Sequence, residues 1–227
     1  MLTRSCLALL LSIHYAHEAV FELILRKEYT LIYTCNNAGT SPLTAAVYAD
    51  KIRMVDMLIR HDPLGLNVQD SAGYTALHVA AMQGRTAIVH FLLDFEAIAV
   101  IVPASKDWTT PLFSAVQARQ VRLAQILVAH APEAVLLPSF DGRLPLIEAV
   151  FSGHLGMVQV LVPVFRDRQI ASIEVYIKNI GFSKLALRQR EAAMFALDWL
   201  RAPATATHNY RYSSPSTGGG IRPFDED

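Results

Sequence analysis

The sequence predicts an all-α fold, a solenoid of stacked helix-turn-helix units joined by short hairpin loops. The main observation is an internal repeat, in which four leucines with similar neighbours are spaced by 34, 35 and 34 residues. Apolar pairs at helical spacing follow each leucine, as they do in an amphipathic helix. In addition, 52% of the 227 residues are apolar, which argues against a disordered chain. Self-similarity at a period of this length is the signature of a repeat architecture.

The clearest copy of the repeat surrounds Leu77, in the stretch YTALHVAAMQG. Its frame consists of Gly73, Thr75, Ala80, Val89 and Leu92, at fixed distances from Leu77. The same frame returns on Leu43, Leu112 and Leu146, although Trp108 stands where the unit of Leu112 would have glycine. We call these four leucines the anchor leucines.

Each unit has the residues that a pair of short helices needs. Thr75 can cap the first helix by accepting backbone N–H bonds, and proline suits the first helical turn where other units carry it. Small alanines let neighbouring helices approach closely, and Gly84 can end the first helix in a left-handed turn. Ile88 and Val89 begin the apolar stripe of the second helix. No unit can bury this stripe alone, so stacking must supply the core.

The segment TALHVA at Thr75–Ala80 resembles the ankyrin repeat, whose signature is T-P-L-H-x-A. SPL at Ser41–Leu43 and TPL at Thr110–Leu112 are the next closest matches. In LPL at Leu144–Leu146 the threonine is lost, so we expect no capping hydrogen bond there. The resemblance implies an ankyrin-repeat solenoid with about four clear repeats and degenerate terminal caps.

The repeat frame also predicts the organisation of the chain. Leu9 lies 34 residues before Leu43, and Leu185 follows Leu146 by 39 residues. The end of the chain is rich in Pro, Ser, Thr and Gly and lacks periodicity, as disordered segments do. The predicted divisions are a degenerate N-terminal repeat or cap (1–35), four ankyrin-like repeats (36–178, divided as 36–69, 70–104, 105–138 and 139–178), a degenerate C-terminal capping repeat (179–202) and a disordered tail (203–227).

The apolar N-terminus allows two interpretations. Arg4 followed by the run Cys6–Leu11 is similar to a short signal peptide, whereas the repeat frame assigns the same residues to a first helix. The run is far shorter than the roughly 20 residues of a membrane helix. We favour the repeat and expect an intracellular protein, cytoplasmic or nuclear, and secretion stays open as the alternative.

No pattern in the sequence predicts catalysis, a cofactor or a metal site. Twenty basic residues balance twenty acidic ones, so we expect neither nucleic-acid nor membrane binding. The spacing of Cys6 and Cys35 fits no zinc pattern, and His14, His17 and Glu18 fit neither metalloprotease order. Basic residues are concentrated towards the C-terminal repeat, and we interpret them as the solvent-exposed face of a helix. The sequence therefore predicts a protein that is not an enzyme.

Ankyrin-like stacks present a concave surface of hairpin tips and exposed first-helix sides, and the resemblance implies that another protein binds there. Large residues at these positions predict the binding site. The predicted partner-binding residues are Tyr48, Tyr74, Met82, Trp108, Phe140, Arg143, Phe151 and Phe182. The alternative is that Trp108 and Phe140 merely pack on adjacent hairpins. We expect a monomeric, non-catalytic interaction module or, as the second hypothesis, a targeting or structural accessory segment of a larger protein or complex.

Overall fold

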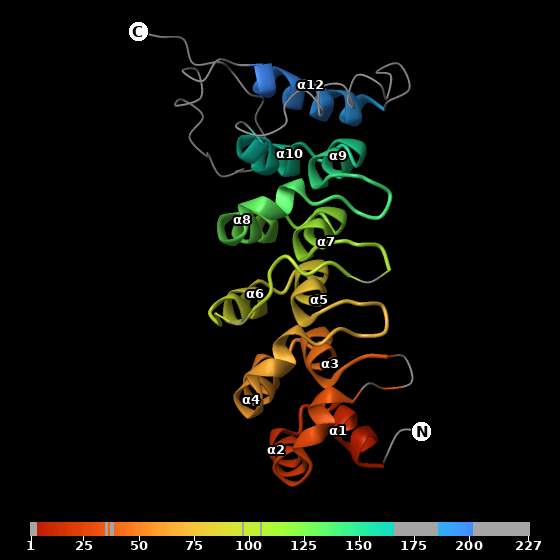
Figure 1. The fold of residues 1–227 in the computed structure, drawn as a ribbon, viewed down its shortest axis with the longest axis vertical. Helices are drawn as coiled ribbons and strands as arrows, with labels where there is room; N and C mark the ends of the chain where they lie inside the picture. Colours follow the sequence, from red (N-terminus) through yellow and green to blue (C-terminus); the bar gives the residue numbers. More distant parts are fainter. Residues whose placement is uncertain are drawn as a thin grey trace.

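The computed structural model describes residues 4–34, 36, 39–96, 98–104, 106–165 and 186–201. Within these ranges the chain forms helices and no strands, and the helices stack in pairs along one axis (Figure 1). The pairs are α1 (Arg4–His14) with α2 (Glu18–Lys27), α3 (Pro42–Tyr48) with α4 (Ile52–His61), α5 (Ala76–Gln83) with α6 (Thr86–Leu93), α7 (Pro111–Gln117) with α8 (Val121–His130), and α9 (Pro145–Phe151) with α10 (Leu155–Leu161). The predicted all-α solenoid is confirmed.

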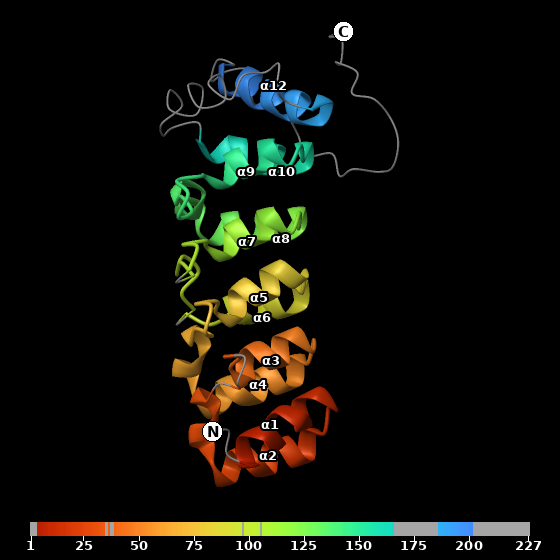
Figure 2. The same ribbon diagram turned by 90° about the vertical axis from the view of Figure 1, so that its right-hand side faces the viewer.

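The helices form two layers beside a row of hairpins. The first helices of the pairs, α1, α3, α5, α7 and α9, lie nearest the hairpin loops, and the second helices form the other layer (Figures 1 and 2). Short 3₁₀ helices lead away from the second helices: η1 (Tyr29–Tyr33), η2 (Pro63–Asn67), η3 (Pro132–Leu136) and η4 (Val162–Phe165). At the C-terminal end, α12 (Leu187–Arg201) packs across α9 and α10.

The anchor leucines form the core, as predicted. Leu43, Leu77, Leu112 and Leu146 are buried, and Leu9 is buried in the same way in the first pair. The alanine three residues after each of the four anchor leucines is fully buried, which lets successive first helices pack closely. No helix pair has this core by itself, because each anchor is covered by the neighbouring pairs.

The turn between the two helices of each pair has the same backbone conformation in all five pairs. The residue seven positions after each anchor leucine, and after Leu9, is left-handed, with φ between 56° and 75°. These residues are Ala16, Asp50, Gly84, Arg119 and Gly153. The first helix pair, which begins with α1, thus has the same left-handed turn and the same buried leucine as the later pairs.

Helix capping follows the serine and threonine pattern. The Ser41 hydroxyl accepts a hydrogen bond from the backbone N–H of Thr44 at 3.2 Å, and the Thr110 hydroxyl accepts one from Phe113 at 3.2 Å. Leu144, which immediately precedes α9, provides no side-chain cap, as expected from the loss of the threonine.

Several predictions concern residues outside the described ranges. They include the site residue Phe182, Leu185 of the predicted C-terminal repeat and the tail 203–227. The predicted repeat boundaries stay predictions.

Candidate functional site

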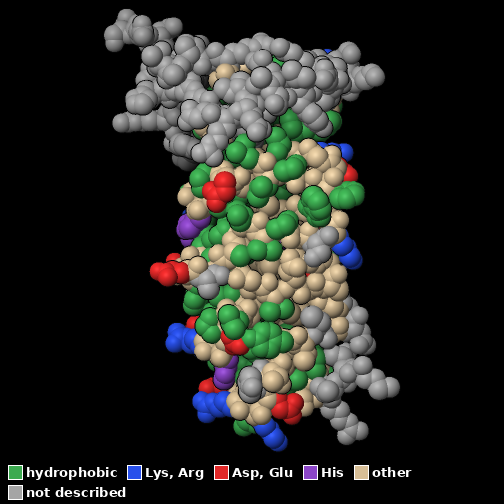
Figure 3. Space-filling model, viewed as in Figure 1, with side chains coloured by type: hydrophobic (Ala, Val, Ile, Leu, Met, Phe, Trp, Pro, Cys, Tyr) green, Lys and Arg blue, Asp and Glu red, His purple; other side chains and the backbone are tan. Residues whose placement is uncertain are grey.

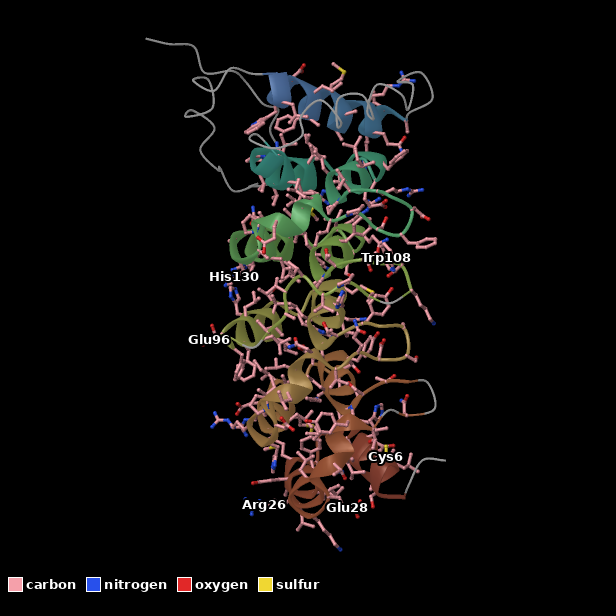
Figure 4. All side chains as sticks on the ribbon, in the orientation of Figure 1. Cys6, Arg26, Glu28, Glu96, Trp108 and His130 are labelled. Carbon is pink, nitrogen blue, oxygen red and sulfur yellow. The ribbon has the colours of Figure 1, made fainter. Side chains whose placement is uncertain are left out.

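The hairpin face is the surface formed by the hairpin tips and the exposed sides of the first helices. Two exposed aromatic residues of this face are Trp108 and Phe140, on two successive hairpins, with 58% and 70% of their surface accessible. Their rings meet edge to face, with centroids 6.2 Å apart and planes at 85°. Figure 4 places Trp108 on the hairpin side of α7, and Figure 3 shows hydrophobic side chains at the surface over α7 and α9. The two rings therefore contact each other while most of their surface stays accessible.

Trp108 stands in a backbone conformation that favours glycine. Its φ is +54°, and the three equivalent hairpin positions hold Gly39, Gly73 and Gly142, with φ of 78°, 86° and 73°. At Gly39 a side chain is also excluded by contact, because an added Cβ would lie 2.0 Å from Cβ of Ser71. A left-handed L-residue costs roughly 1–2 kcal/mol. Because the Trp108 ring is exposed, core packing does not offset this cost.

A hollow of about 130 Å³ lies between these two hairpins and the first helices behind them. It is lined by Lys106, Asp107, Thr109, Phe113, Gln117, Ser139, Phe140, Asp141, Arg143 and Glu148. Sites for drug-sized ligands have volumes of roughly 300–1,000 Å³. The hollow is therefore of a size for one or two side chains of a partner, and its lining offers both charges and an aromatic edge.

Asp107 is held in place by its neighbours. One carboxylate oxygen accepts hydrogen bonds from the Thr109 backbone N–H (3.3 Å) and hydroxyl (2.8 Å), and the other accepts one from the Tyr74 hydroxyl at 2.9 Å. Partial burial pushes the Asp107 pKa upwards, but the hydrogen bonds from Thr109 and Tyr74 outweigh it and hold the pKa below its usual value. Asp107 therefore presents a fixed negative charge at neutral pH.

Tyr74 is the other half of this contact and joins two successive repeats. Burial, and then the hydrogen bond to the Asp107 carboxylate, raise the Tyr74 pKa to about 12, so the hydroxyl stays protonated and donates. Its ring also lies 5.7 Å from that of His78. Tyr74 is thus fixed by the structure of the stack, with only part of its surface open.

Arg143 closes the other side of the hollow. Its guanidinium lies 3.3 Å from the Glu148 carboxylate and 5.5 Å from the centre of the Phe151 ring, within cation–π distance. Both contacts lie within one repeat. They orient the guanidinium along α9, between Glu148 in its first turn and Phe151 at its last residue, and the Arg143 side chain stays 45% exposed.

Comparison with known proteins agrees with this architecture. A family model described as ankyrin repeats, in three copies, matches residues 7–102. Residues 7–102 carry ankyrin repeats. The matched segment starts in α1 and runs past α6, and the ankyrin frame continues through α7–α10 with the same anchors and left-handed turns. None of the curated proteins matches the chain. Ankyrin repeats are generally protein–protein interaction modules and are typically non-catalytic.

The ankyrin stack distributes the predicted site residues unevenly. Phe140 and Arg143 line the hollow and Trp108 lies beside it, whereas Tyr48 and Met82 lie farther along the hairpin face, on α3 and α5. Tyr48 is exposed and Met82 half-buried.

Two of the residues predicted for partner binding also take part in the packing of the stack. Tyr74 and Phe151 are half-buried and pack against the core. The periodicity could not show this, because it does not give the distance between side chains of neighbouring hairpins.

Sequence reasoning did not predict Glu148 as a site residue. The signal that could have found it is the pairing with Arg143, five residues earlier in the hairpin that precedes α9. Within the described ranges, no group of three His, Cys, Asp or Glu side chains could hold a metal ion. Nor is any helix in that part of the chain long and apolar enough to cross a membrane.

Proposed function

We propose that the protein is a non-catalytic binding module that recognises another protein through the hairpin face, centred on Trp108, Phe140 and the hollow beside them. The observation that carries this proposal is the placement of Trp108. A large aromatic residue occupies a left-handed hairpin position where the equivalent residues are glycine, and its ring is exposed. An unfavourable backbone conformation at an accessible position points to a role outside folding.

The chemistry of this region suits a protein partner. Tryptophan and arginine are enriched among the residues that dominate binding energy, and Trp108 and Arg143 lie on successive hairpins around one hollow. The fixed charge of Asp107 and the oriented guanidinium of Arg143 supply directional contacts, while the Trp108 and Phe140 rings supply apolar surface. Tyr48 and Met82 extend the same face towards α3 and α5. A partner segment that follows the stack would contact all of them.

The test is capture of a partner from cell extract by the immobilised chain, followed by titration with the purified partner. The binding variant is Trp108→Gly with Phe140→Ala, and Leu64→Ala is the matched control because Leu64 is 79% exposed on η2, outside the hollow. We expect the wild type and the control to bind one partner and the double variant to lose at least about 10-fold in affinity.

Equal binding by all three chains would place the binding site elsewhere. If no purified protein binds the isolated chain, the hypothesis of a targeting or structural accessory segment is favoured instead.

A further inference from the structure

The outer side of the first helix pair is apolar and exposed. We call this surface the N-face and define it by Leu7, Ala8 and Leu11 of α1 and Val20 and Leu23 of α2. The exposed fractions of its four larger residues run from 46% for Leu11 to 68% for Leu23. None of the five is charged, although a terminal capping repeat needs a polar outer face.

The repeat frame identifies what such a face contacts. In the pair α5–α6 the residues equivalent to the N-face are Thr75, Ala76, Val79, Ile88 and Phe91. The first four are buried and Phe91 is half-buried, and the equivalent residues of the other three later pairs are all buried or half-buried. Only in the first pair are they exposed, so these are the positions that a preceding helix pair covers. The N-face is therefore a stacking interface without its partner in the described chain.

We propose that the N-face binds the N-face of a second copy of this chain, in a dimer with two-fold symmetry. The opposite end of the stack is already covered, because α12 packs across α9 and α10. A symmetric contact buries both apolar faces at once and closes the assembly, whereas a head-to-tail contact leaves one N-face free and leads to open fibres. The five N-face residues carry no charge, and Glu22 and Arg26 in the same helix α2 offset each other in an ion pair at 2.6 Å.

This inference is independent of the proposed function, because the N-face and the hollow lie on different surfaces. It differs from the monomer that the sequence predicts. The repeat frame assigns the apolar run of α1 to a first helix, and the structure buries only part of it: Cys6, Leu9 and Ile13 are buried while Leu7 and Leu11 are exposed.

The mass of the full chain in solution tests the proposal, by light scattering after gel filtration at several concentrations. We expect a dimer for the wild type and a monomer for Leu11→Glu with Leu23→Glu, because four carboxylates would meet in an apolar interface. The dissociation constant should rise about 100-fold or more. Leu64→Glu and Met194→Glu are the controls: each places one carboxylate at an exposed apolar position, on η2 and on α12 respectively, and each should remain dimeric.

A charge-reversal experiment separates loss of contact from loss of folding. Leu11→Lys with Leu23→Lys should be monomeric alone and should form a heterodimer when mixed with the Glu variant, because opposite charges then face each other. Circular dichroism should show the same helix content for all variants. The proposal is overturned if the wild type is monomeric at about 100 μM, if the mixture of Lys and Glu variants stays monomeric, or if only Met194→Glu dissociates the dimer.

Discussion

His78 in α5 and Thr109 in the next hairpin are joined by a buried hydrogen bond. Nε2 of His78 lies 2.9 Å from the backbone carbonyl oxygen of Thr109, and Nδ1 accepts a bond from the Thr75 backbone N–H at 3.2 Å. The carbonyl can only accept, so Nε2 carries the proton and the ring is neutral. His78 is fully buried, and this burial lowers its pKa to about 4. One neutral imidazole therefore connects two successive repeats.

The neutral state of His78 makes stability depend on pH. In the unfolded chain its pKa is about 6.5, so between about pH 6.5 and about pH 4 the unfolded state binds more protons than the folded state. The contribution of His78 is fully present above about pH 6.5 and is lost as the pH falls towards 4, by about 3 kcal/mol in total. Urea unfolding across this range measures it.

His78→Gln is the control for this pH dependence, because glutamine does not titrate. Carboxylates also titrate near pH 4, so the quantity to compare is the difference in unfolding free energy between the wild type and the variant at each pH. We expect this difference to shrink as the pH falls from about 6.5 to about 4. A difference that stays constant would show that His78 is not held neutral in the fold.

Replacing an anchor leucine should destabilise the stack. Leu77 is fully buried, so Leu77→Ala should lower the free energy of unfolding by about 2–5 kcal/mol through lost burial and a cavity. Leu64→Ala, at an exposed position on η2, should change it by less than about 0.5 kcal/mol. Chemical denaturation of both variants gives the comparison, and similar losses would contradict the assignment of Leu77 to the core.

The repeat period predicts much of the fold because it records backbone and core requirements. It locates the anchor leucines, the left-handed turn at Gly84 and the unusual position of Trp108. Contacts between side chains of neighbouring hairpins do not follow from the period, since they depend on how far one repeat is shifted and twisted against the next. The bond from Tyr74 to Asp107 is such a contact. Exposure of the N-face is another property that the period leaves open, because it depends on what stacks there.

Removing the Tyr74 hydroxyl should release Asp107. In Tyr74→Phe the carboxylate keeps its bonds from Thr109 but loses the one from the phenol, so the Asp107 pKa should rise towards its usual value. Stability above that pKa should fall by about 1 kcal/mol, because one hydrogen bond to a partly exposed carboxylate is lost. NMR titration of the Asp107 carboxyl group measures the pKa. An unchanged pKa would mean that the two side chains do not bond in solution.

The left-handed backbone at Trp108 predicts that glycine is a more stable replacement there than alanine. Trp108→Gly and Trp108→Ala both lose the edge contact with Phe140, but only glycine adopts φ of +54° without steric cost. The glycine variant should therefore be the more stable of the two by about 1 kcal/mol, and should stay within about 1 kcal/mol of the wild type because relief of strain offsets the lost contact.

Gly142→Ala tests the cost of the same left-handed conformation by adding a side chain, whereas Trp108→Gly removes one. An added Cβ at Gly142 meets no atom within 4 Å, so only its φ of +73° opposes the substitution. We expect a loss of about 1 kcal/mol in the free energy of unfolding. If Trp108→Ala is instead more stable than Trp108→Gly, the Trp108 backbone is not left-handed in solution. Trp108 would then carry no local strain, and its position would no longer indicate a role in binding at the expense of stability.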